Sequence, residues 1–176
     1  IPTGTDYTWV SAPDASSPGI YKKEVKVTLP QGSTDKPRNS TNVPVTIKVR
    51  PNPPQISTDQ VTNTGGLPNR DITVTNALPG ATVTLTIGGK QLPAKTADNT
   101  GRVTFAAKDL ADSNGLLPTG NVTVKQSKEF LNPVTNRNET LESDVRTVAI
   151  TAETEKPHVS YKVTIDGKEP KKDSKD

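Results

Sequence analysis

The sequence contains no cysteine and no methionine, and it has only one histidine, one tryptophan, three tyrosines and two phenylalanines among 176 residues. Without cysteine the chain has no disulfide framework, no thiolate zinc site and no cysteine nucleophile. With His158 as the single histidine, we expect neither a histidine-based triad nor a multi-histidine metal site. Paired carboxylates for glycoside hydrolysis would need a pocket with flanking aromatic residues, which are scarce here. We therefore predict a protein that is not an enzyme, with no catalytic, cofactor-binding or metal-binding residues and no cofactor.

Long apolar runs and clustered charge are also lacking. No segment approaches the roughly 20 apolar residues of a membrane span, so we expect no insertion into a membrane. The net charge is +3, and its carriers are scattered except at the extreme C-terminus. Nucleic-acid binding would need a clustered basic face, and we predict no nucleic-acid partner. The chain starts abruptly at Ile1 without a signal peptide, which indicates a piece of a longer protein.

What the sequence does contain is apolar residues in alternation with polar ones, together with sixteen prolines and twelve glycines. Such alternation predicts strands of antiparallel sheets with one buried face. Only 105–113 is compatible with a helical turn. The expected strands are 25–29, 43–49, 71–75, 81–87, 102–106, 121–126, 144–151 and 158–165.

Turn-forming residues separate these runs, and one proline-rich segment divides the chain. Gly, Asn and Asp tolerate positive φ, so Pro79-Gly80, Gly88-Gly89, Asp98–Gly101 and similar clusters predict hairpins or inter-sheet loops. Arg50-Pro51-Asn52-Pro53-Pro54 has three prolines in five residues, which disfavours both helix and central strand. It therefore predicts a stiff, extended linker.

The first 51 residues carry a family pattern. Gly4-Thr5-Asp6-Tyr7-Thr8-Trp9 precedes a strand, then Leu29-Pro30-Gln31-Gly32-Ser33, and then the closing run Val43-Pro44-Val45-Thr46-Ile47. This pattern resembles the Rib/alpha-like repeats of Gram-positive surface proteins, with Leu29 and Gln31 in place of the family's Tyr and Asp. About seven additional residues, 36–42, lengthen the hairpin before the last strand.

The middle of the chain shows a second resemblance. A Leu78-Pro79-Gly80-Ala81 corner leads into a Val-Thr-Leu-Thr-Ile strand, a Gly-Gly turn and an Ala-Asp-Asn-Thr-Gly hairpin. This combination is similar to bacterial Ig-like modules. The order of the two segments, joined by a proline-rich linker, is similar to the non-helical part of giant staphylococcal extracellular-matrix-binding surface proteins.

These patterns together predict an all-β fold of small Ig-like β-sandwich modules in tandem, end to end, with little or no helix. We expect a Rib-like module at 1–50, the proline-rich linker at 51–55 and an Ig-like sandwich at 56–153. Residues 154–176 are expected to hold a linker or the start of a further module, with a disordered tail. Few apolar residues lie near the junction, so a small, polar interface is expected there.

Several residues invite a functional interpretation. Asp98, Asn99, Asp109 and Asp112 suggest a calcium site, but their spacing is not that of an EF-hand loop, and Asx residues in hairpins usually cap their own backbone. We expect turn chemistry, with a cation site as the alternative. His158 lies in an alternating run, which favours a strand or linker position over a proton switch.

Other residues suggest packing or cross-linking. Tyr7 and Trp9 alternate with Thr8, and in a chain with few large side chains they are predicted to anchor the core rather than to form an exposed ligand platform. An autocatalytic Lys–Asn isopeptide link would need a Lys, an Asn and a buried acid to meet in the core, which sequence alone does not test. The sequons at Asn39, Asn121 and Asn138 carry no meaning in the bacterial context that the resemblance implies.

The resemblance implies a location outside the cell, on the bacterial cell wall. The function that it favours is a stalk of a surface adhesin, which holds a binding region away from the cell. Its partners would be neighbouring modules of the same chain, and we expect a monomer. The alternative is direct adhesion to a matrix protein such as fibronectin through an edge strand or a loop surface of the middle module. A third class, an accessory domain of a carbohydrate-active enzyme, needs exposed aromatic platforms that the composition hardly provides.

Overall fold

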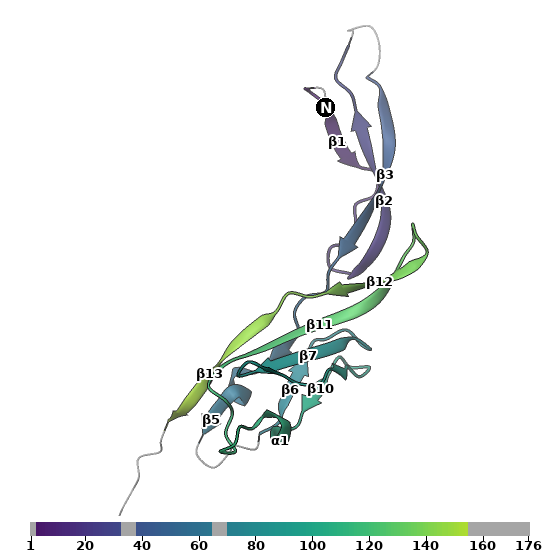
Figure 1. The fold of residues 1–176 in the computed structure, drawn as a ribbon. Coiled ribbons are helices and arrows are strands. Elements are labelled where there is room, and N and C mark those ends of the chain that lie inside the picture. The colour runs from purple at the N-terminus through teal and green to yellow at the C-terminus, as the bar shows by residue number, and fades with distance from the viewer. Residues whose placement is uncertain (1–2, 33–37, 65–69, 155–176) are drawn as a thin grey trace, which may run out of the picture.

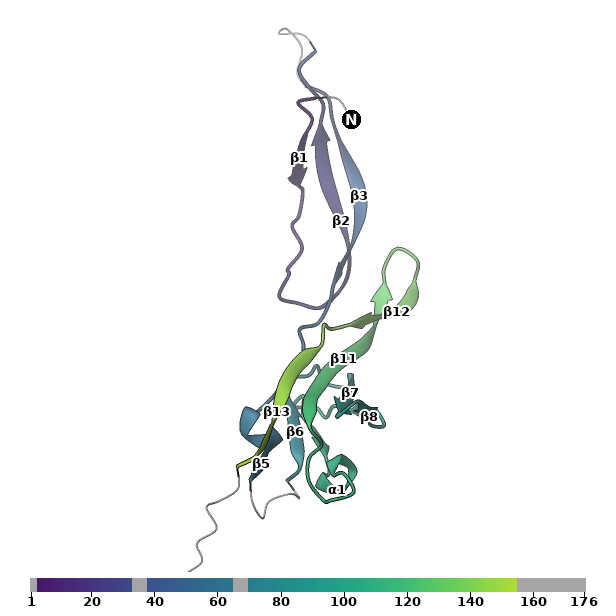
Figure 2. The ribbon, with the colours of Figure 1, turned by 60° about the vertical axis from the view of Figure 1, so that its left-hand side comes forward.

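A computed structural model describes residues 3–32, 38–64 and 70–154 of the chain. The molecule is elongated, with a three-stranded sheet at one end and a two-sheet sandwich at the other (Figures 1 and 2). The sequence predictions for His158, for the strand at 158–165 and for the charged tail lie outside the described residues.

The N-terminal sheet is antiparallel and has the order β1-β2-β3. Trp9 lies opposite Val25, which in turn lies opposite Val43. Because side chains alternate between the two faces of a strand, these residues share one apolar face, while Lys22, Lys26 and their neighbours share the other. The strands are β1 (Asp6–Trp9), β2 (Gly19–Thr28) and β3 (Ser40–Val49).

The prediction that Tyr7 and Trp9 anchor a core is wrong. Their exposed fractions are 53% and 46%, among the largest of the apolar residues described. The physical reason lies in the architecture: within the described part of the chain, the apolar core cluster begins at Ile56 and includes no residue of the N-terminal sheet. An amphipathic sheet without a second layer leaves its aromatic residues half exposed.

Residues 55–154 form the sandwich, in which two sheets enclose one core. The larger sheet has the order β5-β13-β11-β7-β8, with β12 paired to β11 and β9 to β7, and the smaller has the order β10-β6-β4. Neighbouring strands are antiparallel except for β5 and β13, which are parallel. The strands of the larger sheet are β5 (Thr62–Thr64), β7 (Thr82–Ile87), β8 (Lys90–Gln91), β9 (Lys95–Thr96), β11 (Gly120–Asn132), β12 (Arg137–Glu142) and β13 (Arg146–Thr154). Those of the smaller sheet are β4 (Gln55–Ile56), β6 (Ile72–Thr75) and β10 (Val103–Phe105).

The core of the sandwich comes from the alternating runs of the sequence. The buried residues of β7 and β11 face those of β6 and β10 across the two layers. The largest of these fully buried side chains is that of Phe105. Members include Ile72, Val74, Val83, Leu85, Ile87, Val103, Phe105, Val122 and Val124.

The prediction of an all-β fold with little helix is confirmed. The helical elements of the described chain are two single turns, the 3-10 helix η1 (Thr58–Val61) and α1 (Ala107–Leu110). The second lies inside the segment 105–113 that the sequence allowed for a turn. The strand predicted at 121–126 continues to Asn132, and its partner β12 was not predicted. The sequence of β12, Arg-Asn-Glu-Thr-Leu-Glu, has one apolar residue and therefore lacks an alternation signal.

Candidate functional site

The proline-rich segment between β3 and β4 lies against the sandwich. Pro51 and Pro54 are buried, although no strand includes residues 50–54. The side chain of Gln126 donates from Nε2 to the carbonyl oxygen of Asn52 at 2.6 Å. Arg146 donates from Nε to the carbonyl oxygen of Pro54 at 2.7 Å. Prolines restrict the backbone of the segment, and these two donors fix two of its carbonyl groups.

Gln126 connects three parts of the structure although its exposed fraction is only 2%. Besides the bond to Asn52, its Oε1 accepts from the backbone N–H of Leu78 at 2.7 Å. Its own backbone N–H donates to Oγ of Ser143 at 2.9 Å. Buried polar groups are stable only when they are bonded, and this amide has partners for both ends. Sequence reasoning treated Gln126 as the last residue of a strand and did not assign it this role.

Charged residues complete the contact between the two ends of the molecule. Lys48 Nζ, on β3, lies 2.7 Å from Glu139 Oε1 on β12. Arg50 Nη2 lies 2.9 Å from Asp144 Oδ1, and Arg50 Nε donates to the carbonyl oxygen of Glu142 at 2.7 Å. We call the contacts of Lys48, Arg50 and residues 51–54 with the sandwich the junction. It combines these ion pairs and hydrogen bonds with the two buried prolines, Pro51 and Pro54.

The hydrogen bond from the Lys48 ammonium group lowers the pKa of Glu139 below its ordinary value, and a second from the side chain of Asn132 adds to the effect. Asn132 is buried and donates from Nδ2 to Glu139 Oε2 at 2.5 Å. The carboxylate is therefore held in its ionised form by both neighbours. Ion pairs at this level of exposure contribute little stability and are screened by salt.

Lys48, Glu139 and Asn132 are a lysine, an acid and an asparagine in one cluster. An isopeptide link would therefore be sought among these three side chains. The required environment is missing, however. The side chains of Lys48 and Glu139 are 47% and 35% exposed, and the lowered pKa of Glu139 opposes the neutral acid that such a link would use. The contact is therefore an ion pair with an additional hydrogen bond, and not a buried reactive centre.

Two of the three carboxylates considered for calcium, those of Asp98 and Asp112, are bonded within their own turns, whereas Asp109 lies on the short helix α1. Asp98 Oδ1 accepts from the backbone N–H groups of Thr100 and Arg102 at 2.8 and 3.0 Å, and the hydroxyl of Thr100 gives the largest lowering of its pKa. Asp112 Oδ1 accepts likewise from the N–H groups of Asn114 and Leu116. Within the described residues no group of three or more His, Cys, Asp or Glu side chains is placed to hold a metal ion.

The turn at 98–101, which joins β9 of the larger sheet to β10 of the smaller sheet, also needs its glycine. Gly101 has φ +79°, and a Cβ atom there would lie 2.2 Å from the carbonyl oxygen of Ala77. The carbonyl oxygen of Gly101 in turn accepts the N–H of Ala77 at 3.1 Å. The Asp98–Gly101 cluster therefore fixes the approach of two loops of the sandwich.

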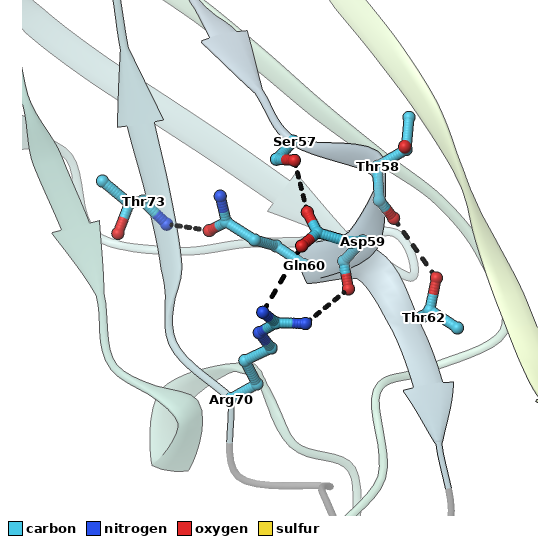
Figure 3. Close-up of polar contacts among 7 residues, drawn as sticks. All are labelled: Ser57, Thr58, Asp59, Gln60, Thr62, Arg70 and Thr73. Atoms are coloured by element: carbon cyan, nitrogen blue, oxygen red, sulfur yellow. Dashed lines mark hydrogen bonds and ion pairs between the residues drawn. The ribbon is translucent and has the colours of Figure 1, made fainter.

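A further polar cluster surrounds η1, and it is shown in Figure 3. Arg70 donates from Nη1 to the carbonyl oxygen of Asp59 at 3.0 Å, and its Nη2 lies 3.4 Å from Oδ2 of the same residue. Oε1 of Gln60 accepts from the backbone N–H of Thr73 at 2.5 Å. The hydroxyl of Ser57 donates to Asp59 and is the largest cause of its lowered pKa. These contacts bind the turn to β6 beside the fully buried Val61, so the cluster is structural.

The comparison with protein families gives a match over one part of the chain. No solved structure matches the chain. No helix in the described ranges is both long and apolar enough to span a bilayer. Residues 1–51 match the family model of the Rib domain, which confirms the resemblance predicted for the N-terminal segment and associates it with a repeat of Gram-positive cell-surface proteins.

Proposed function

We propose that this protein is a spacer of a Gram-positive cell-surface adhesin, which lies outside the cell on the cell wall and projects a binding region from it. The match of residues 1–51 to the Rib domain supports the surface location. The observation that carries the spacer role is the junction. There the linker and the ends of two elongated sheets are held by side-chain contacts instead of being left free.

The junction suits a spacer for a physical reason. Strands extend by about 3.3 Å per residue, so sheets placed end to end give reach with few residues. A free linker would lose this reach by bending, whereas prolines and bonded carbonyls limit the conformations of 50–54. The exposed ion pairs of Lys48 and Arg50 restrict the angle further, but they can break and re-form under load because water competes for both partners.

Small-angle scattering and single-molecule energy transfer test the proposal. The scattering radius of gyration should exceed the roughly 16 Å of a compact globule of this length. For energy transfer, the cysteine-free chain accepts two dyes at introduced cysteines, Thr41→Cys in the N-terminal sheet and Asn99→Cys in the sandwich. We expect one narrow distance distribution, which broadens in the double variant Lys48→Ala/Arg50→Ala.

A matched control separates the junction from charge in general. The double variant Lys26→Ala/Lys108→Ala removes the same charge from exposed positions away from the junction, and its distribution should equal that of the parent protein. A compact radius of gyration, or a parent distribution as broad as that of the junction variant, would rule out a stiff spacer.

Direct adhesion to a matrix protein such as fibronectin is the second candidate, and one observation favours it. The outer edge of β3, ten residues long, pairs with no other strand among the residues described. Such an edge can accept an extended peptide by β-augmentation. One feature of β3 opposes this function. Pro44 in the middle of the strand lacks an N–H group, and prolines and lysines on edge strands usually protect against this pairing.

A pull-down with soluble fibronectin tests this second function. Binding that is lost when Thr46 or Asn42 on β3 is replaced by proline would support adhesion through the edge. Absence of binding by the parent protein, with an established fibronectin-binding protein as positive control, would leave the spacer role alone.

A further inference from the structure

A small cavity on the sandwich combines positive charge with an apolar lining. Its volume is about 250 Å³. Three exposed lysines from different elements line it: Lys90 from β8, Lys95 from β9 and Lys108 from α1. These lysines carry no recognisable signal in the sequence, because they are scattered along the chain and meet only in the folded sandwich.

The described residues that line this cavity leave it with an excess of positive charge. Among them Asp109 is the only carboxylate, so three positive charges face one negative charge. None of the five ion pairs found among the described residues includes Lys90, Lys95 or Lys108. Like charges held close together repel one another, and an incoming anion would relieve that repulsion.

The apolar lining of the cavity is mostly buried. Leu92 and Phe105 line it, but both belong to the core and are only 3% and 1% exposed, so the exposed Pro93 supplies the accessible apolar surface. Lys95 is held over the Phe105 ring, with Nζ at 5.3 Å from the ring centroid, and it donates to the carbonyl oxygen of Thr104 at 2.9 Å. One of the three ammonium groups is therefore already positioned, while the other two lie on flexible, exposed side chains.

From this geometry we propose that the cavity binds one acidic sugar unit of an anionic polysaccharide. The lysines pair with its sulfate, phosphate or carboxylate group, and the exposed Pro93 packs against the C–H face of the ring. A volume of 250 Å³ is smaller than the roughly 300–1,000 Å³ of pockets for drug-sized ligands, so one ring fits better than an extended molecule. A polymer repeats the same unit, and rebinding along it strengthens an otherwise weak single contact.

Titration of the ¹⁵N-labelled chain, followed by nuclear magnetic resonance, tests the proposal. Three probes are used: a heparin-type sulfated tetrasaccharide, poly(N-acetylglucosamine 1-phosphate) as a phosphodiester-linked wall polymer of sugar rings, and neutral dextran. Binding is expected to shift the amide signals of Leu92, Lys95, Phe105 and Lys108 with one or both anionic probes and not with dextran. The probe that binds more tightly distinguishes a sulfated matrix polysaccharide from the cell's own wall polymer as the source.

Two double variants with the same change of charge separate a site from general attraction. Lys90→Gln/Lys108→Gln removes two lysines of the cavity and leaves the Lys95 bond intact, whereas Lys22→Gln/Lys26→Gln removes two exposed lysines of β2. We expect the first to weaken binding at least tenfold and the second less than twofold. All four positions are exposed, so circular dichroism should show both variants folded, and the lysines after 165 are the same in both.

Two results would overturn the proposal. Equal weakening in the two variants would mean that net charge alone attracts the polymer. Absence of shifts at the cavity with both anionic probes would mean that it is not a binding site. Because the spacer function depends on the junction and not on this cavity, either result leaves the energy-transfer test of the spacer unaffected.

Discussion

The two ends of this molecule use the same alternating sequence pattern but bury very different amounts of it. In the sandwich, β7 and β11 place their apolar residues against a second sheet, and Leu85 and Val122 are fully buried. In the N-terminal sheet, the face that carries Trp9 and Val43 has no counterpart in the core cluster, and both residues remain more than a third exposed. Alternation therefore predicts a strand, but it does not tell whether a second layer covers that strand.

This difference has a consequence for stability. Burial of apolar area is the main favourable contribution to folding, and the described core lies almost entirely in residues 56–150. The N-terminal sheet depends on its backbone ladder, on the Arg38–Asp6 ion pair and on the junction. We expect the sandwich to be the more stable end of the molecule.

The largest expected effect compares one leucine from each end. Leu85→Ala in the sandwich should lower the free energy of unfolding by about 2–5 kcal/mol, because it leaves a cavity in a closed core. Leu29→Ala beside the N-terminal sheet should cost less than about 1 kcal/mol, because Leu29 is 42% exposed. Chemical denaturation is followed by circular dichroism for the whole chain and by fluorescence of Trp9, the only tryptophan, for the N-terminal sheet. Equal losses for the two variants would show that the ends share one core.

The second prediction concerns the side chain that fixes the linker on the sandwich. Gln126→Leu keeps the volume near that of the amide but leaves the N–H of Leu78 and the carbonyl of Asn52 without their partner. The expected loss is about 1–3 kcal/mol in the free energy of unfolding. Gln91→Leu on the exposed strand β8 is the matched control and should lie within about 0.5 kcal/mol of the parent. A Gln126 variant as stable as this control would mean that water replaces the lost bonds.

Much of the fold could be predicted from local sequence signals. The runs at 43–49, 81–87 and 121–126 alternate strictly, and strands occur at all three. The Asp98–Gly101 turn was predicted from residue types that favour positive φ, and Gly101 has it. Both signals depend only on residues that are neighbours in the sequence, so they can be recognised before the fold is known.

What could not be predicted depends on contacts between distant residues. Gln126 is bonded to Asn52, 74 positions away, and Lys48 is paired with Glu139, 91 positions away. The lysine cavity likewise needs β8, β9 and α1 to be folded before it exists. The exposure of Trp9 was not predicted because a scarce aromatic residue in a strand is usually buried. In the described part of the chain, no second sheet covers the face that carries Trp9.

The smallest expected effect concerns the junction, where the two ends of the molecule meet. The Lys48 ammonium group, with Asn132, holds the pKa of Glu139 below its ordinary value. A carboxyl group whose pKa is lowered by a contact strengthens that contact when it is ionised. The contribution of Glu139 to the stability of the junction is therefore fully present above the ordinary glutamate pKa of about 4.3. It is lost as the pH falls through the lowered pKa that Glu139 has in the junction.

The energy-transfer distribution between dyes at positions 41 and 99 should accordingly stay constant from pH 7 down to the ordinary glutamate pKa of about 4.3 and broaden as the pH falls below it. Glu139→Gln should already broaden it slightly at pH 7 and should weaken its dependence on acid, because the group that titrates is gone. Glu129→Gln on the neighbouring strand β11 removes an exposed carboxylate that forms no ion pair among the described residues, and it should behave as the parent does. If Glu139→Gln and Glu129→Gln respond alike to acid, the Lys48–Glu139 pair does not restrict the junction, and the contacts of Arg50 and the bonded carbonyls of 52 and 54 hold the two ends together.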